Sequence, residues 1–296
     1  MIAKTRRAGT LSLVEAAVVF GAGFVGAAIS ESLGGRGQVT SLDIDTHPAL
    51  AQRNDEARSI VESVLNESGA DIVVNASGRL RGTDDEMNDA NVAWPKWLIE
   101  VLADRDVRFV HLGSASEYGE PTSSAPLSES DQVHPKGIYG ESKWAGSRAV
   151  LAARDAGLDA VVARGFNLVG PHLAPVSPLH QFLTDVGNLP VEGGEVELWW
   201  PDTVRDFILL EDLAEGVARL ALADDPPPIV NMCSGIGVSF GDIVKAMAAA
   251  QGKSVTIASL DKPGIETVIG DSRLLRELTG LDPQMSAELI AERAGI

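Results

Sequence analysis

Short apolar runs alternate along the chain with longer segments in which apolar residues recur every three or four positions. This alternation is typical of βαβ units, in which parallel strands form a sheet with helices on both faces. Six such runs stand out, at 16–20, 39–42, 72–74, 108–112, 160–163 and, after three prolines, 229–231. The pattern predicts an α/β fold built on a doubly wound parallel sheet, in which ligands bind outside the carboxyl ends of the strands.

A glycine-rich segment, Gly21-Ala22-Gly23-Phe24-Val25-Gly26, directly follows the first run. In a G-x-G-x-x-G turn the first glycine permits the tight turn, the second lets the backbone approach a pyrophosphate, and the third lets the helix lie close to the strand. The N–H groups at the start of the helix then bind phosphate oxygens. We therefore expect a Rossmann domain in which Gly21, Gly23, Phe24, Val25 and Gly26 hold a dinucleotide. The alternative is an ordinary glycine turn.

An acidic residue, Asp43, ends the second run twenty positions after Gly23. This is the separation expected for a carboxylate that binds the adenosine ribose hydroxyls and repels a 2′-phosphate. Residues 43–47 contain no Arg or Lys to offset that charge, so NAD(H) is favoured over NADP(H). Asp45 could share or take over the role, and a solvated loop acid is the structural alternative.

Prolines interrupt the strand and helix alternation just beyond the middle of the chain. We place the NAD(P)-binding Rossmann domain at residues 13–170, with segments near 206–232 returning to it. Residues 171–205 and 233–296 are expected to form a smaller C-terminal substrate-binding lobe. Residues 1–12 show no pattern that would pair them with the rest and are expected to be a loose arm.

Tyr139 and Lys143 stand four residues apart in a helical segment, so both side chains lie on one face. A nearby ammonium favours the phenolate, which lowers the pKa of the tyrosine toward a range useful for acid–base chemistry. Ser114, at the end of the preceding strand, could donate a hydrogen bond to a substrate oxygen. A Tyr-x-x-x-Lys pair alone is common on helix surfaces, but its coincidence with this serine and a dinucleotide turn favours catalysis, with Tyr139 as the acid–base.

The charge balance narrows the class of partner. The chain has 24 Lys and Arg against 42 Asp and Glu, a formal charge of −18, so its overall field repels a nucleic acid. No apolar run approaches the ~20 residues of a membrane-spanning helix, and the first residues lack the apolar stretch of a secretory signal, so we expect a cytoplasmic protein without a membrane partner. The single cysteine, Cys233, excludes an intramolecular disulfide and a thiolate cage, and we expect no metal.

From about Val14 to Pro283 the chain resembles the extended short-chain dehydrogenases/reductases, the NAD-dependent epimerase/dehydratase family that acts on nucleotide sugars. The motifs that carry the resemblance occur in the family's order: 23–26, 71–77, Asn91-Val92, Ser114 before Tyr118-Gly119, Tyr139-Gly140-Glu141-Ser142-Lys143, 164–171, Val204-Arg205-Asp206-Phe207 with Asp212, and 231–235. The resemblance implies a catalytic triad of Ser114, Tyr139 and Lys143, with Tyr139 and Lys143 also contacting the cofactor and Lys143 bonding the nicotinamide ribose. It also implies a homodimer.

Further contacts follow from the resemblance alone. Asn75 and Ser77 would lie on the cofactor side, and Asp55 is a weaker candidate for the adenine end. The substrate would contact Ser114, Ser116, Asn167 and Arg205. Arg205 suits the diphosphate, because the donors of an arginine fork pair well with phosphate oxygens. Asp206 is open between a functional role and a structural ion pair with Arg205.

Departures from the family pattern help to choose the reaction. Phe20 stands where many relatives have a glycine, and Gly113 where many have a serine. Ala115-Ser116 stands where 4,6-dehydratases carry an Asp-Glu pair, and the missing acid argues against a reaction that eliminates water. The segments 113–119, 164–171 and 231–235 are most similar to those of reductases of 4-keto-6-deoxy nucleotide sugars, such as the GDP-4-keto-6-deoxy-mannose reductases. An NAD-dependent nucleotide-sugar 4-epimerase and a non-catalytic NAD-binding sensor are the alternatives.

Two aromatic features have structural interpretations. Trp199-Trp200 could stack a base or a sugar, but aromatic residues in a strand-like run are more often packing residues. His111, inside a predicted strand, is expected to be a core residue.

Overall fold

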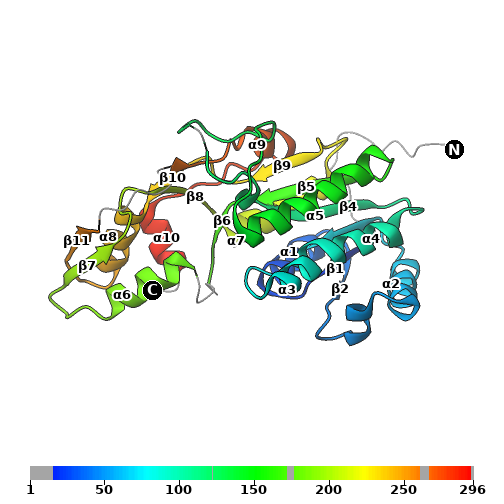
Figure 1. The fold of residues 1–296 in the computed structure, drawn as a ribbon, viewed down its shortest axis with the longest axis horizontal. Helices are drawn as coiled ribbons and strands as arrows, with labels where there is room; N and C mark the ends of the chain where they lie inside the picture. The colour runs from blue at the N-terminus through cyan, green and yellow to red at the C-terminus, as the bar shows by residue number, and fades with distance from the viewer. Residues whose placement is uncertain (1–15, 122, 172–176, 261–266, 295–296) are drawn as a thin grey trace.

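The computed structural model describes residues 16–121, 123–171, 177–260 and 267–294, so the predicted arm at 1–12 lies outside the described residues. A parallel sheet with strand order β2-β1-β3-β4-β5-β9 forms the centre of the larger lobe, on the right in Figure 1. Its strands are β1 (Ala16–Phe20), β2 (Gln38–Leu42), β3 (Ile72–Asn75), β4 (Arg108–Ser114), β5 (Ala160–Gly165) and β9 (Ile229–Met232). The doubly wound sheet predicted from the apolar runs is confirmed, and the run at 229–231 does return to it, beside β5.

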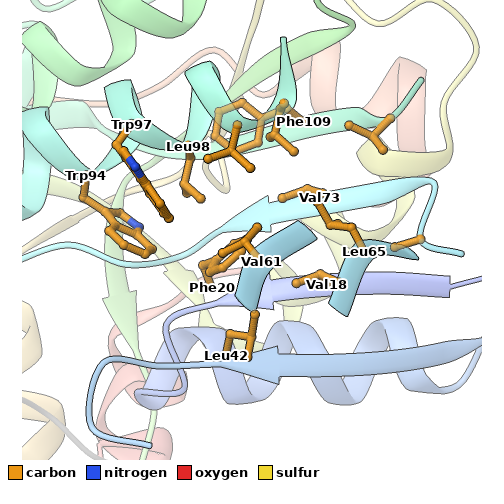
Figure 2. Packing of buried hydrophobic residues seen from close by; sticks show 14 of the residues in the cluster. Val18, Phe20, Leu42, Val61, Leu65, Val73, Trp94, Trp97, Leu98 and Phe109 are labelled. Carbon is orange, nitrogen blue, oxygen red and sulfur yellow. The ribbon is translucent and has the colours of Figure 1, made fainter. Parts of the chain in front are cut away.

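Helices cover both faces of this sheet because successive side chains of each strand point in opposite directions. Val18 and Phe20 of β1 face one cluster with Trp94 (Figure 2), whereas Ala17 and Val19 belong to the cluster on the other face. The first cluster is covered by α2 (Asp55–Ser68), α4 (Trp94–Leu102) and α5 (Gly137–Asp155), and the second by α1 (Phe24–Gly34), α7 (Leu210–Leu222) and α9 (Arg273–Thr279).

Three short helical turns lie in the connections after β2, β3 and β4. The 3₁₀ turns η1 (Pro48–Gln52) and η3 (Ala115–Glu117) follow β2 and β4. Between β3 and β4 the chain runs without a break through α3 (Asp84–Asn88), the π-helical turn η2 (Asp89–Ala93) and α4. A capping box at Thr83 and Glu86 begins α3, since each side chain accepts the other residue's backbone N–H.

The second lobe lies beyond the carboxyl end of the sheet (Figure 1). Strand β8 (Val204–Leu209) pairs with β6 (Asn167–Val169), β10 (Gly237–Ser239) and β12 (Thr267–Val268), and β7 (Gly194–Leu198) pairs with β11 (Val255–Ser259). Helices α6 (Pro178–Gly187), α8 (Phe240–Ala250) and α10 (Ala287–Arg293) share the lobe's own apolar cluster.

Two segments lie where the sequence division did not place them. β8 belongs to the sheet of the second lobe, although it starts the stretch expected to return to the central sheet. Conversely α9, in the stretch assigned to the lobe, buries Leu275 in the cluster beneath the central sheet. The chain therefore crosses between the lobes more often than the proline pattern indicated. No helix among the described residues is long and apolar enough to span a membrane.

Two glycines of α1 differ in how much space surrounds them, which allows a test of whether close packing requires glycine. A Cβ on Gly26 would lie 1.6 Å from the carbonyl oxygen of Gly21, whereas a Cβ on Gly34, at the end of the same helix, meets no described atom within 4 Å. We expect Gly26→Ala to lower the free energy of unfolding by about 3 kcal/mol, the upper end of ordinary overpacking. Gly34→Ala should change it by less than about 1 kcal/mol, because alanine is the better helix former. Urea denaturation of both variants checks this, and equal stabilities would contradict the contact.

Candidate active site

A cleft of ≈ 710 Å³ opens at the carboxyl ends of β1, β2 and β3. Its walls include Gly21 and Gly23 of the glycine turn, Asp43 after β2, and Ser77 after β3. Ligands of doubly wound sheets bind at this edge.

The three glycines of the turn serve different purposes. Gly21 has a φ of 95°, and a Cβ on it would lie 2.8 Å from the backbone nitrogen of Ser77. Gly26 is required by the close contact with Gly21. A Cβ on Gly23 meets none of the described atoms within 4 Å, so the fold itself does not require glycine there. The open space at Gly23 fits a ligand that approaches the backbone, as a pyrophosphate does.

The start of α1 also fits an anion. Gly23 is its N-cap residue, no side-chain cap is present in the described turn, and its first turn carries no acidic residue. The first N–H groups of an α-helix lack intrahelical partners and can donate to an anion. The positive end of the helix dipole at the same place also attracts negative charge. The turn therefore offers backbone N–H donors and no opposing charge to an anion such as a pyrophosphate.

Asp43, rather than Asp45, reaches the glycine turn. Its Oδ2 accepts a hydrogen bond from the backbone N–H of Ala22 at 2.6 Å, and its Oδ1 accepts one from the N–H of Asp45 at 2.9 Å. The carboxylate is thereby fixed at the edge of the cleft, where it remains accessible to ribose hydroxyls.

Two predicted cofactor residues lie elsewhere. Asp55 is exposed in the first turn of α2 and does not line the cleft, where Arg53 stands instead. Asn75 is buried, with its Nδ2 3.0 Å from Nδ1 of His111 and its Oδ1 accepting from the backbone N–H of Ser77 at 3.2 Å. Asn75 therefore positions Ser77, which does line the cleft. His111 is a core residue as expected, and burial holds its pKa well below the ordinary value.

Ser114, Tyr139 and Lys143 are brought together by β4 and α5. Ser114 ends β4, and its side chain lies near enough to the phenol of Tyr139 to lower the pKa of that phenol. The ammonium of Lys143 donates to the carbonyl oxygen of Leu112, also on β4, at 2.5 Å. α5 can approach this closely because Gly140 faces the turn after β4, where a Cβ would lie 2.7 Å from the carbonyl oxygen of Ser116.

A buried ion pair that the sequence did not reveal lies behind this group. The carboxylate of Glu117 pairs with the guanidinium of Arg164 at 2.9 Å, and neither side chain is exposed to solvent. Glu117 Oε1 also accepts the backbone N–H of Ser114 and the hydroxyl of Ser147 on α5, both at 2.8 Å. Gly113 explains the fit, since a Cβ there would lie 2.8 Å from the same carboxylate oxygen. This departure from the family pattern is therefore structural.

Burial controls the acid–base properties of the group. It raises the pKa of Tyr139 above the ordinary value; the hydrogen bond with Ser114 acts against this rise, and the charge of Glu117 adds to it. Burial also lowers the pKa of Lys143 to about 8, against the opposing effect of Glu117. The expected net lowering of the Tyr139 pKa is not found, because desolvation of the phenol outweighs stabilisation of the phenolate and the ammonium of Lys143 donates to the carbonyl oxygen of Leu112.

Asn91, of the Asn91-Val92 motif, connects the loop after β3 to α5. From the π-turn η2, its side chain donates to the carbonyl oxygen of Arg79 at 2.9 Å and to the hydroxyl of Ser142 on α5 at 3.0 Å. The loop that it holds passes Lys143, since a Cβ on Gly78 would lie 3.7 Å from the Lys143 ammonium. Its place in the Asn91-Val92 motif was the available signal.

Comparisons with known proteins identify the family of the chain. Residues 17–233 match the NAD dependent epimerase/dehydratase family. The chain is 31% identical over 267 residues to a dTDP-6-deoxy-L-talose 4-dehydrogenase (NAD(P)(+)) of Kitasatospora kifunensis, with 83% of this chain and 82% of the relative covered. The chain belongs to the NAD dependent epimerase/dehydratase family. It is thus an oxidoreductase of the extended short-chain dehydrogenase/reductase type, as the motifs indicated.

More distant relatives of the family differ in their reactions. A UDP-glucose 4-epimerase of Drosophila melanogaster is 27% identical, with 79% of this chain and 75% of the relative covered. A GDP-6-deoxy-D-mannose reductase of Pseudomonas aeruginosa is 23% identical, with 60% and 61% covered. Among solved structures, RMD from Pseudomonas aeruginosa complexed with NADPH has the same fold, with a TM-score of 0.78, 20% identity and coverage of 96% and 97%.

The residues expected to meet the substrate come from both lobes. Asn167 is exposed at the start of β6, where its Nδ2 donates to the carbonyl oxygen of Asp206 at 2.7 Å. Arg205 on β8 lies with its guanidinium carbon 5.7 Å from the centre of the Phe240 ring. Ser116, in the turn η3 after β4, donates its backbone N–H to the Ser114 hydroxyl at 3.2 Å.

Asp206 is a structural junction. Its carboxylate accepts the N–H and hydroxyl of Ser234, the N–H of Gly235 and the N–H of Gly270, all between 2.7 and 3.0 Å. These neutral donors come from two segments, Ser234-Gly235 and Gly270, and they favour a structural role for Asp206. Burial raises its pKa to about 6, although these hydrogen bonds act in the opposite direction.

The tryptophan pair is not a packing feature. Trp199 and Trp200 are 46% and 42% exposed, with ring centres 6.3 Å apart. The strand-like run that suggested burial ends at Leu198, so both rings stand in the turn before β8. As for metals, the described residues contain no group of His, Cys, Asp and Glu side chains arranged to bind one.

Gly23 gives a test of ligand binding that is separate from folding. Because its surroundings hold no described atom that a methyl group would meet, Gly23→Ala should leave the free energy of unfolding within about 0.5 kcal/mol of the original. The added methyl group would occupy the space of a pyrophosphate, so the affinity for NADH should fall about tenfold, or ~1.4 kcal/mol. Calorimetric titration with NADH checks this, and unchanged affinity would show that the turn is not the phosphate site.

Proposed function

We propose that the protein is an NAD(H)-dependent reductase of a 4-keto-6-deoxy nucleotide sugar. The observation that carries the proposal is that β4 and α5 bring Ser114, Tyr139 and Lys143 together, because the Lys143 ammonium donates to the Leu112 carbonyl on β4 and Gly140 lets α5 pack against the turn after Ser114. A binding protein without catalysis would need the glycine turn but not this group. The similarity to a 6-deoxy-sugar 4-dehydrogenase and a 6-deoxymannose reductase supports a reaction at C4.

The side chains account for the proton in this reaction. A bound NADH supplies a hydride to the C4 carbonyl carbon, and the carbonyl oxygen then needs a proton to become the alcohol. Ser114 donates a hydrogen bond that orients this oxygen, and Tyr139 donates its phenolic proton to it. Lys143 stabilises the phenolate that remains, because an ammonium near an anion in a buried site interacts strongly with it.

The raised pKa of Tyr139 suits this direction of reaction. A phenol with the ordinary tyrosine pKa is already protonated at neutral pH, and burial moves the pKa of Tyr139 further in that direction. A proton donor rather than a proton acceptor is therefore present, which is the state that a ketone reductase requires at the start of turnover. Oxidation of the alcohol needs the opposite state and is favoured at higher pH.

The cleft supports NAD(H) over NADP(H). Among its described lining residues, five carry carboxylates, namely Asp43, Asp45, Asp85, Glu86 and Asp89. Two carry guanidinium groups, Arg53 and Arg79, and both of these are paired, with Asp89 and Glu86 respectively. A 2′-phosphate adds about two negative charges, which this lining repels.

A 4-epimerase is the second candidate, favoured by the similarity to UDP-glucose 4-epimerases. One assay separates the three functions. A reductase consumes one NADH for each 4-keto-6-deoxy nucleotide sugar that it reduces, measured at 340 nm. An epimerase interconverts UDP-glucose and UDP-galactose without consuming added NADH, and a sensor does neither. Absence of NADH consumption across GDP-, dTDP- and UDP-linked 4-keto-6-deoxy sugars would overturn the proposal.

Removal of the phenolic hydroxyl tests the proton donor. Tyr139→Phe should lower kcat by about 10²–10⁴-fold, the usual contribution of a general acid. The affinity for NADH should stay within about twofold, because the glycine turn and Asp43 are unaffected. Single-turnover kinetics and calorimetry measure the two quantities, and a variant that retains its turnover would contradict the role of Tyr139.

The lowered pKa of Lys143 predicts a pH limit. The ammonium is present below a pH of about 8 and is lost as the pH rises through that value, two to three units earlier than for an exposed lysine. We therefore expect kcat/KM for NADH, which reports the free enzyme, to fall above about pH 8. Measurement from pH 6 to 10 at saturating keto sugar checks this, and a flat profile to pH 10 would contradict it.

A further inference from the structure

Two ion pairs lie in the lining of the cofactor cleft. Arg53, which follows η1 on the β2 side, pairs across to Asp89, the first residue of η2. Arg79, which follows β3, pairs with Glu86 of the nearby α3 at 2.6 Å. Both arginines line the same cleft as Asp43. Both guanidinium groups in the described lining are thus already paired with acids of the same lining.

Arg53 is held in place by its backbone. It caps η1 in the left-handed conformation, with φ 49° and ψ 29°, which is uncommon for a residue other than glycine. The next residue, Asn54, caps α2 by accepting the N–H of Ala57 at 3.0 Å. The arginine is therefore fixed at the junction of two helical turns, at the end of the segment that begins with Asp43.

The pairing with Asp89 occupies both terminal nitrogens of Arg53. Nη1 donates to Asp89 Oδ2 at 3.1 Å, and Nη2 contacts Asp89 Oδ1. A guanidinium engaged as a fork with one carboxylate has its preferred geometry for phosphate already used. Asp89 thereby both adds a negative charge to the cleft and withholds the arginine from a phosphate.

We propose that Asp89 determines the choice of cofactor by holding Arg53 in this pair. The inference rests on the proposed function, in that it assumes a dinucleotide in the cleft. With Asp89 ionised, a 2′-phosphate on the adenosine ribose meets a neutralised arginine and the carboxylate of Asp43, and NADH is preferred. Without the Asp89 charge, Arg53 turns toward the 2′-phosphate and donates to it, and NADPH is accepted.

The test is calorimetric titration of the full-length protein with NADH and NADPH. Asp89→Asn should tighten NADPH binding about tenfold and change NADH binding by less than about twofold, as expected for one new charge-assisted hydrogen-bonded pair. Adding Arg53→Gln to that variant should remove the gain. Adenosine 2′,5′-bisphosphate and AMP, used as probes of the adenosine end alone, should show the same pattern.

Asp85→Asn is the matched control, because Asp85 lines the same cleft and its removal changes the net charge equally. It should alter NADPH affinity by less than about twofold. An equal gain in Asp85→Asn, a gain that persists without Arg53, or no gain in Asp89→Asn would each overturn the inference while leaving the proposed function intact. If the original protein binds neither dinucleotide, the proposed function fails as well.

Discussion

The buried pair of Glu117 and Arg164 is the interaction on which the catalytic group depends. One carboxylate holds the backbone of Ser114 at the end of β4, the hydroxyl of Ser147 on α5 and the guanidinium of Arg164 on β5. The two elements that carry Ser114, Tyr139 and Lys143 are thereby fixed to each other. Loss of one partner from a buried pair costs about 3–5 kcal/mol, since it leaves an uncompensated charge. The ring of Tyr118, 4.4 Å from the guanidinium carbon, closes the pocket around Arg164.

The π-turn η2 connects the two ends of the site. Asn91 faces α5 and the loop beside Lys143, whereas Asp89, two residues earlier, faces Arg53 at the adenosine end. A π-turn adds a residue to a helical turn and is frequent at functional sites. Here one short segment contacts both α5, through Asn91, and Arg53 in the lining of the cleft, through Asp89. The proposed choice of cofactor and the position of α5 thus share one structural element.

Much of the fold could be predicted from the sequence, because strand burial and the glycine turn leave local signals. The apolar runs located the strands of the central sheet, and the spacing of Gly23 and Asp43 located the edge of the cleft. Features set by tertiary contacts were not predictable. Nothing local marks Glu117 as buried or Asp89 as the partner of Arg53, and the direction of the Tyr139 pKa depends on desolvation that only the packed structure defines. Asp55 was misplaced for the same reason, since its distance from the cleft depends on how η1 turns the chain.

Burial lowers the pKa of Lys143 and the charge of Glu117 raises it, so the two together set the pH at which the ammonium loses its proton. The most direct measurement is an NMR titration of the Lys143 side chain, labelled with ¹³C at Cε, in the original protein and in Glu117→Gln. The account predicts a midpoint near pH 8 in the original protein and a lower midpoint in the variant, because Glu117 raises the pKa against the effect of burial. A midpoint near that of an exposed lysine, or the same midpoint in a folded Glu117→Gln variant, would contradict it.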